Sequence, residues 1–444
     1  MYTYLILESL SAIVGVVAIC AVLFYFWKSK ILHPVFQNKW FYIPALLFVV
    51  VFFLGMIANK TYSPDFAMPT FMMSHAPGGV SPAIPFSKII EFFKYGDRFE
   101  KIADIGADPN AVPASPQLPD EDGIVKIHLT TKEVIGEVAP GIYFNYWTFD
   151  KQVPGPMLRV REGDTVELSI TNDVTSLHHH NIDLHAVTGP GGGAAVTHVA
   201  PGETKTLQWK ALNPGLYIYH CAMPNVSTHN SHGQYGLIMV DPKDESLALP
   251  SVDKEFYIVQ GELYTMGQIG KKGLVPFDSE ALLDGTPNYV TFNGKVEDAP
   301  RMKAQVGDRI RMYVGNGGVN LISSFHVIGE IFDTVYPEAN IGGTKYHNVQ
   351  TTAVLPGGAS IVEFTVDVPG KYLLVDHALA RMNKGAWAIL EVTGPDSPEI
   401  YKEVEVKNDN MQINLEHYAV KYINNTLSYL GRVSKKHGKI SRGR

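Results

Sequence analysis

The feature that most constrains the fold is a sequence pattern that occurs twice between residues 123 and 394. Residues 158–168 (LRVREGDTVEL) resemble residues 302–312 (MKAQVGDRIRM). A second pair of similar segments follows: Pro-Gly-Glu at 201–203 and Pro-Gly-Leu-Tyr at 214–217, and Pro-Gly-Gly at 356–358 and Pro-Gly-Lys-Tyr at 369–372. Two tandem copies of one domain explain such a repeat most simply.

Within this region, short runs alternate apolar and polar residues, and Pro-Gly or Gly-Asp turns separate the runs. Alternation with a period of two is typical of strands with one buried face, and many short strands are typical of a β-sandwich. We therefore expect an all-β fold of two tandem Greek-key β-sandwiches, at residues 122–248 and 249–394.

Two uncharged apolar segments precede the repeats. Ser9–Trp27 and Trp40–Ala58 each contain 19 residues without a charge, close to the roughly 20 that a bilayer-spanning helix needs. Three lysines and no acidic residue lie between them, which places this loop in the cytoplasm by the positive-inside rule. Residues 1–58 are thus predicted to form a transmembrane hairpin. The alternative is a cleaved signal peptide followed by a core helix.

The segments on either side of the repeats have a different composition. Residues 59–121 are rich in proline and predict a tether, interrupted at Ser87–Ile105 by the apolar spacing of one amphipathic helix. Residues 395–444 lose the strand pattern, and six of their last 13 residues are Lys or Arg. We interpret them as a solvated basic tail, with contact to anionic lipid or to a partner as the alternative.

The composition excludes several classes of protein. The chain of 444 residues is 45% hydrophobic, which argues against global disorder, and its net charge of −7 argues against nucleic acid as a partner. Its two cysteines are Cys20, in an apolar run, and Cys221, beside a histidine. A disulfide framework is therefore not expected, and Cys221 is interpreted as a chemically active residue.

The residues that suggest chemistry lie in short motifs. These are His180-Asn-Ile-Asp183-Leu-His185, Tyr219-His220-Cys221 followed by His229, and His326 and His377 in the second repeat. One thiolate with two imidazoles is the ligand set of an electron-transfer copper site. A cluster of three histidines suits a second metal that keeps an open position for a substrate.

Strand geometry sorts these residues into two groups. Side chains alternate between the faces of a strand, so the adjacent His220 and Cys221 point in opposite directions. The two predicted groups are His180, Cys221 and His229 on one face, and His185 and His220, with Asp183 beside them, on the other. Two metals held by adjacent residues would share a short covalent path for electron transfer.

Residues 123–394 resemble the copper nitrite reductases, which have two tandem cupredoxin domains. The resemblance rests on three motifs: HNIDLHAVTG from His180, PGLYIYHCA from Pro214 and SSFHVIG from Ser323. The short spacing between Cys221 and His229 is similar to the shorter-looped subgroup of the family. The resemblance implies one type 1 and one type 2 copper per subunit, a homotrimer, and one-electron reduction of nitrite to nitric oxide.

The resemblance also implies a role for each matching residue. The type 1 copper ligands would be His180, Cys221 and His229, and the type 2 ligands would be His185, His220 and His377, with His377 reaching a neighbouring subunit. Asp183 and His326 would deliver protons, and Ile328 would shape the pocket over the metal. The sequence departs from the family at the axial type 1 position, where Gln234 stands in place of methionine.

The expected protein is therefore a nitrite reductase of denitrification or nitrate respiration, anchored in a bacterial inner membrane with its catalytic domains in the periplasm. Its electron donor would be a cytochrome, a cupredoxin or a quinol-linked membrane complex. Two alternatives remain from sequence: a two-domain multicopper oxidase, and a tethered cupredoxin that carries electrons without catalysis. The first would need paired His-X-His motifs, and the second would leave His185, His220, His326 and His377 without a role.

Overall fold

The computed structural model describes residues 99–296 and 301–404. It divides into two units, residues 1–396 and 397–444, and every described strand and helix lies in the first. The predicted transmembrane hairpin, residues 59–98 of the predicted tether and most of the basic tail lie outside the described residues. Within the described ranges, no helix is long and apolar enough to cross a membrane.

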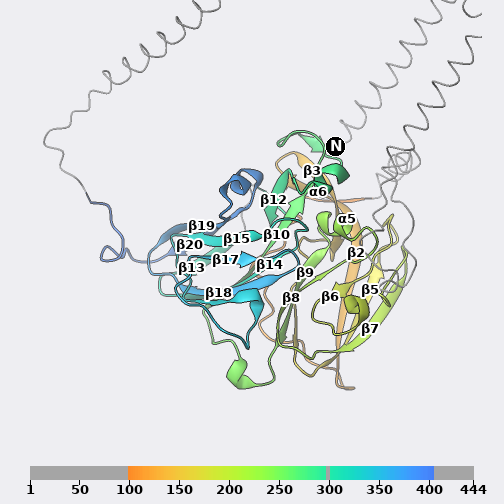
Figure 1. Cartoon of the computed structure of the whole chain (residues 1–444), viewed down its shortest axis with the longest axis horizontal. Helices are drawn as coiled ribbons and strands as arrows, with labels where there is room; N and C mark the ends of the chain where they lie inside the picture. The colour runs from red at the N-terminus through yellow and green to blue at the C-terminus, as the bar shows by residue number, and fades with distance from the viewer. Residues whose placement is uncertain (1–98, 297–300, 405–444) are drawn as a thin grey trace, which may run out of the picture. The chain divides into compact units, whose positions relative to one another are not determined.

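The first sandwich consists of two facing sheets (Figure 1), formed by strands of the first repeat together with β1, which precedes that repeat, and β11, which comes from the second repeat. One has the order β11-β3-β2-β5-β7, with β1 beside β2, and the other has the order β4-β9-β8-β6. Their bounds are β1 Glu100–Ile102, β2 Ile124–Ala139, β3 Ile142–Phe149, β4 Leu158–Arg161, β5 Thr165–Asn172, β6 Asp183–Leu184, β7 Thr204–Lys210, β8 Gly215–His220, β9 Tyr235–Asp241 and β11 Gly273–Leu274.

Strands of the second repeat form two further sheets, β12-β10-β14-β18-β16 and β13-β20-β19-β15-β17. Their bounds are β10 Lys254–Leu263, β12 Tyr289–Phe292, β13 Arg301–Gln305, β14 Arg309–Asn316, β15 Ser323–Ile328, β16 Thr334–Tyr336, β17 Thr351–Val354, β18 Ala359–Thr365, β19 Gly370–Asp376 and β20 Trp387–Thr393. The helices are short: α5 Val226–Ser231, α6 Ser279–Leu283, and the 3₁₀ turns η4 Pro190–Gly193, η5 Glu245–Leu247, η6 Pro337–Ala339 and η7 Leu379–Lys384. The prediction of an all-β fold is confirmed.

The three largest apolar cores of the described residues hold the layers together, and a small fourth cluster consists of Phe99, Ile135 and Leu274. One fills the first sandwich and another fills the second. The third joins the two, because Leu216 and Ile218 of β8 pack in the same cluster as Val259 of β10 and Ile361 of β18. The two sheets on either side of this third core, β4-β9-β8-β6 and β12-β10-β14-β18-β16, are therefore buried on both faces. Accordingly, almost every residue of β9, β10, β14 and β18 is buried, and buried and exposed positions do not alternate along these strands.

The structure departs from the predicted tether at residues 99–107, which pack against the first sandwich, whereas residues 108–121 contain no helix or strand. Strand β1 pairs in parallel with β2, and Phe99 and Ile105 are buried. The predicted amphipathic helix at Ser87–Ile105 is also wrong over its last residues, since β1 replaces it there. Of the described apolar side chains in that stretch, Phe99 packs against Ile135 of β2, and Ile105 belongs to an apolar core.

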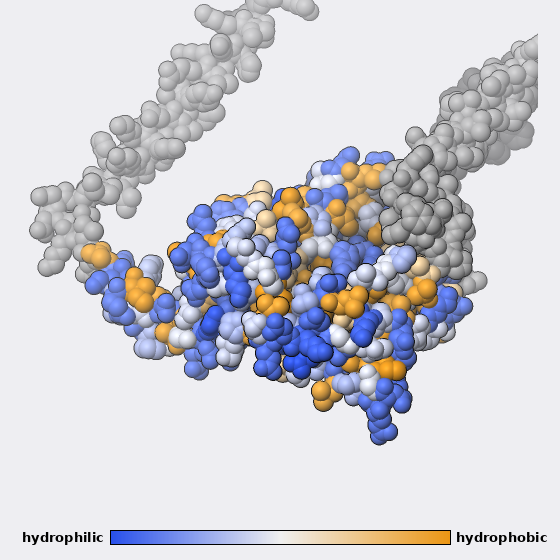
Figure 2. All heavy atoms as spheres, turned by 60° about the horizontal axis from the view of Figure 1, so that its bottom comes forward, coloured by the Kyte–Doolittle hydropathy of each residue, from blue (hydrophilic) through white to orange (hydrophobic). Residues whose placement is uncertain are grey.

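Outside the cores, the face shown in Figure 2 carries hydrophobic residues scattered among polar ones. Such scattered exposure is ordinary for a folded protein. These exposed residues contrast with the buried residues of the interior strands. The burial of apolar side chains in the layered core is therefore the main source of stability.

The packing of residues 99–121 predicts the effect of shortening Ile105, which is 0% exposed. Ile105→Ala should lower the free energy of unfolding by about 2–5 kcal/mol, as for other buried aliphatic truncations. Denaturant titration of the folded protein measures this. Leu118→Ala, at a side chain that is 83% exposed, is the control and should change little. Equal stabilities would mean that the segment does not belong to the core.

Candidate metal centre

Strand β8 ends at the two residues on which the site depends. Strand β6 pairs antiparallel with β8, with Asp183 opposite His220 and Leu184 opposite Tyr219. His220 remains half-buried at the surface, whereas Cys221 is 0% exposed. The two adjacent side chains therefore lie on opposite sides of the chain.

The buried group consists of His180, Cys221 and His229, whose possible ligand atoms all lie within 4.8 Å of one another. Cys221 Sγ lies 3.3 Å from His229 Nδ1 and 4.0 Å from His180 Nδ1. Gln234 is also fully buried, and its Oε1 lies 3.3 Å from His229 Nδ1. The amide oxygen of Gln234 thus faces the same small space as the thiol and the imidazoles.

The surroundings of the buried group exclude water. Trp147 is stacked between His178 and His232, with ring centroids 4.3 Å and 4.2 Å away, and its edge meets His229 at 4.5 Å. On the other side, Asn181 Oδ1 accepts a hydrogen bond from the Ala222 amide at 2.7 Å. The motifs in the sequence did not identify Trp147, His178 or Asn181 as neighbours of this group.

The donor set of the buried group fits a copper ion. Burial raises the pKa of the Cys221 thiol to about 12 and lowers the pKa of His229 well below its ordinary value. Without a cation, the pocket therefore favours a neutral thiol and neutral imidazoles. A metal cation reverses this preference, because a coordinating thiol is deprotonated outright. A soft thiolate with two imidazoles is a combination that suits copper.

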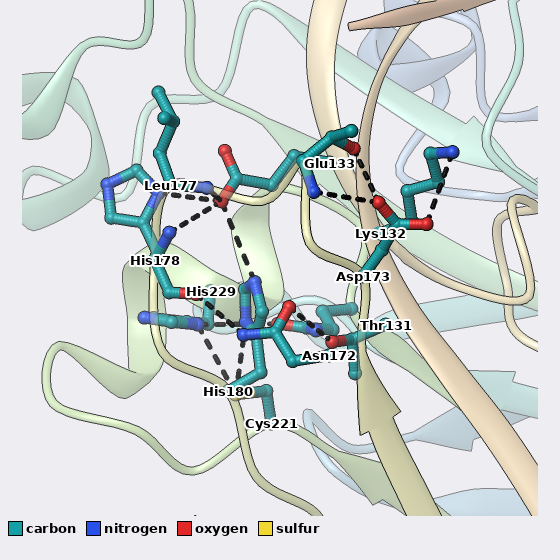
Figure 3. Close-up of polar contacts among 12 residues, drawn as sticks. Thr131, Lys132, Glu133, Asn172, Asp173, Leu177, His178, His180, Cys221 and His229 are labelled. Atoms are coloured by element: carbon teal, nitrogen blue, oxygen red, sulfur yellow. Dashed lines mark hydrogen bonds and ion pairs between the residues drawn. The ribbon is translucent and has the colours of Figure 1, made fainter. Parts of the chain in front are cut away.

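A buried carboxylate that the sequence reasoning missed lies beside this group (Figure 3). Glu133 of β2 is 0% exposed and accepts hydrogen bonds from the backbone amides of Leu177 and His178 at 2.6 Å and 2.8 Å. Burial alone would raise the pKa of Glu133, but the neighbouring His178 and His180 lower it below its ordinary range. The one weak indication of Glu133 in the local sequence is that a charged residue stands at an inward-facing position of a strand.

The surface group consists of Asp183, His185 and His220. The Nε2 atoms of the two histidines lie 3.1 Å apart. His220 Nδ1 is 3.0 Å from the Cys221 carbonyl oxygen, and the ring of His185 hydrogen-bonds the backbone of Gly357 in the second sandwich. Each ring is thus oriented through one nitrogen, as second-shell hydrogen bonds orient metal ligands.

Asp183 completes the surface group. Its Oδ2 lies 3.9 Å from His220 Nε2, and its side chain packs against Gly192 in the η4 turn. A Cβ on Gly192 would lie 1.9 Å from Asp183 Oδ1, and the φ angle of Gly192 is +53°. Glycine is therefore required at this position by both space and backbone conformation.

The second-repeat pair consists of His326, on β15, and His377, which directly follows the neighbouring strand β19. His326 of β15 and His377 at the end of β19 have ring centroids 5.4 Å apart, and His326 Nδ1 is 2.5 Å from the Gln350 carbonyl oxygen. Below them, the fully buried Asp376 pairs with Arg381 at 2.6 Å and holds the turn that presents His377. Ile328 lies two residues beyond His326 on the same strand and is 41% exposed.

The structure does not bring all the predicted ligands of the second metal together. Among the described residues, the clusters that could hold a metal are the buried group and the surface group, and His377 is in neither. The surface group therefore lies on the first sandwich, and the second-repeat pair lies apart from it on the second.

Comparisons with known proteins agree on a copper protein. A family model described as multicopper oxidase matches residues 136–245. A copper-containing nitrite reductase of Neisseria gonorrhoeae is 54% identical over 280 residues, which cover 62% of this chain and 70% of that protein. A copper nitrite reductase structure from Nitrosomonas europaea matches with 34% identity and a TM-score of 0.55, over 62% of this chain and 96% of that one. A crystal structure described as a multicopper oxidase matches with 26% identity and a TM-score of 0.55, over 65% and 98% of the two chains.

The contact between Gly192 and Asp183 predicts a local cost. Gly192→Ala should lower the free energy of unfolding by at least about 1–2 kcal/mol, the cost of a left-handed conformation for a residue with a Cβ, and should displace Asp183. Denaturant titration and a crystal structure of the variant measure the two effects. Gly189→Ala is the matched control in the same turn, since an added Cβ there contacts nothing. An unmoved Asp183 would contradict this account.

Proposed function

This chain belongs to the copper-containing nitrite reductase family, and we propose that it reduces nitrite by one electron, NO₂⁻ + 2 H⁺ + e⁻ → NO + H₂O. It is an enzyme of a copper-dependent, all-β cupredoxin-like class. The observation that carries the proposal is the pair of donor groups at the end of β8, where Cys221 belongs to the buried group and the adjacent His220 belongs to the surface group. Adjacent residues supply a short covalent path between an electron-accepting site and a substrate site.

The two groups have different proposed tasks. The buried group, with Gln234 as the axial residue, would hold the type 1 copper in a dry pocket. The surface group supplies His185 and His220 for the type 2 copper and remains open to solvent. Bound copper supplies one-electron redox chemistry and Lewis acidity. The open position matters because nitrite must reach the second site while water is kept from the first.

The reaction consumes two protons, and two residues are placed to supply them. Asp183 lies beside His220 in the surface group. The Nδ1 atom of His326 is engaged by the Gln350 carbonyl, which leaves its Nε2 for exchange with substrate or water. We assign Asp183 and His326 as proton donors and Ile328 as the residue that narrows the pocket around nitrite. Positioned acid–base groups contribute roughly 10²–10⁴-fold to rate.

We propose a homotrimer as the functional unit, because one chain carries two complementary half-sites. The exposed Ile322, Ile328 and Leu379 flank the second-repeat pair, at 49%, 41% and 51% exposure. Such an apolar edge around two histidines suits contact with another subunit, whose surface group lacks a third imidazole. In this arrangement His377 would complete the type 2 ligand set of a neighbour.

We also propose that residues 1–58 anchor the enzyme in a bacterial inner membrane, with the sandwiches in the periplasm. The two uncharged apolar segments support this. The electron donor would then be a cytochrome, a cupredoxin or a quinol-linked complex close to the membrane. A soluble form for comparison with the full chain should begin before Phe99, since β1 and Ile105 belong to the folded unit.

The central experiment follows nitrite consumption, nitric oxide and copper content in the purified full-length protein. Native protein should form nitric oxide and hold two coppers per chain, whereas reduction of oxygen without nitrite turnover would favour a multicopper oxidase. His377→Ala should keep the blue colour of the buried group but lose turnover by more than the roughly 10- to 100-fold that loss of a second-shell partner causes. His347→Ala, an exposed histidine of the same sandwich, is the control. Full activity of His377→Ala would refute the ligand assignment.

Gln234 predicts a low reduction potential for the type 1 copper. An amide oxygen is a harder donor than a thioether and stabilises the oxidised metal, and the axial ligand tunes the potential. Gln234→Met should raise the potential by at least the roughly 59 mV of a tenfold change in a one-electron equilibrium. Redox titration of the blue absorption band measures this. A fall, or no change, would mean that Gln234 is not the axial ligand.

A further inference from the structure

Neighbouring residues of β2 serve opposite sides of the first sandwich (Figure 3). Lys132 points outward and pairs with Glu100 and Asp173, at 3.1 Å and 3.3 Å. Glu133 points inward and is completely buried. Glu133 Oε1 accepts hydrogen bonds from the backbone amides of Leu177 and His178 and lies 3.1 Å from His178 Nδ1. An oxygen that faces so many nitrogen atoms is best accounted for as part of an ionised carboxylate, since a carboxylate only accepts hydrogen bonds.

The same carboxylate lies beside a proposed copper ligand. Glu133 Oε1 is 3.8 Å from His180 Nε2, whereas His180 Nδ1, on the other edge of the ring, faces Cys221 Sγ. His180 Nε2 and Glu133 Oε2 are both buried and have no hydrogen-bond partner among the described residues. Unpaired buried polar atoms are costly. These two unpaired atoms, on side chains that approach to 3.8 Å, therefore indicate that Glu133 and His180 are partners for each other.

We propose that Glu133 is a positioning residue for the type 1 site and accepts a hydrogen bond from His180 in the copper-bound protein. Copper bound at Nδ1 requires the proton of the neutral imidazole to reside on Nε2, where Glu133 is the adjacent acceptor. A carboxylate in this place fixes the tautomer and the ring orientation and makes the imidazole a stronger donor. The stronger donor and the buried negative charge both favour oxidised over reduced copper.

A purely structural role for Glu133 makes a different prediction. Glu262 shows what that role looks like: it is 2% exposed and accepts the Leu321 amide at 2.8 Å and the Asn320 amide at 3.1 Å. It lies in the second sandwich and contacts neither group of proposed ligands. Replacing such a residue changes stability and leaves a copper potential unchanged, which makes Glu262 a matched control.

The test replaces the charge and keeps the shape. Glu133→Gln retains an amide oxygen for the Leu177 and His178 N–H groups but removes the negative charge. In the copper-loaded full-length protein, the equilibrium between oxidised and reduced type 1 copper should shift toward the reduced form by at least about tenfold, or about 59 mV. Glu262→Gln should give no shift. A Glu133→Gln protein that holds blue copper at the native potential would overturn the proposal.

A second variant covers the case in which Glu133→Gln does not fold. Glu133→Asp keeps the charge but withdraws it from His180 by one methylene, so the same equilibrium should shift in the same direction by a smaller factor. An unchanged potential in Glu133→Asp would also overturn the proposal. The inference rests on the proposed assignment of His180 as a copper ligand, but not on catalysis. Native protein that shows the blue band without nitrite turnover would refute the proposed function and leave the role of Glu133 to be decided by the potentials.

Discussion

The antiparallel pairing of β6 with β8 is the constraint on which both candidate metal groups depend. It places Asp183 opposite His220 at the strand end, and the alternation of the backbone then turns Cys221 into the core. A shift of one residue in this pairing would exchange the buried thiol for the half-buried imidazole and destroy both groups at once. The large apolar cores on either side of the sheet make such a shift costly in free energy. Residues that contact neither metal group therefore keep both groups in place.

The two groups differ mainly in their access to water. The buried group is enclosed by Trp147 and its stacked histidines, and its potential ligands are kept neutral by burial until a cation is present. The surface group is open, and its histidines are oriented by carbonyl oxygens rather than by enclosure. This contrast suits a division of labour in which one site exchanges electrons with little rearrangement and the other admits a small anion.

Local sequence was sufficient for the all-β class and for the grouping of His180 and Cys221 apart from His185 and His220, because these depend on periodicity and spacing. It was not sufficient for Glu133, which lies some fifty residues before the histidine that it approaches and becomes a neighbour only when β2 packs beside the 177–180 loop. Strand β1 was missed because three residues of an added parallel strand have no periodicity of their own. The family resemblance pointed to His377, but within one chain His377 belongs to neither candidate metal cluster of the described residues.

The third core, shared by Leu216 and Ile218 of the first sandwich and Val259 and Ile361 of the second, bears on how the repeat is built. Although the sequence consists of two similar halves, neither half is a self-sufficient module. A protein cut near residue 248 would expose to solvent the apolar face that contains Leu216 and Ile218, and a large exposed apolar face promotes aggregation. The two repeats are therefore separate in sequence, but each depends on the other for its stability. Exchange of one half for a homologous sandwich would require the facing surface to be re-matched residue by residue.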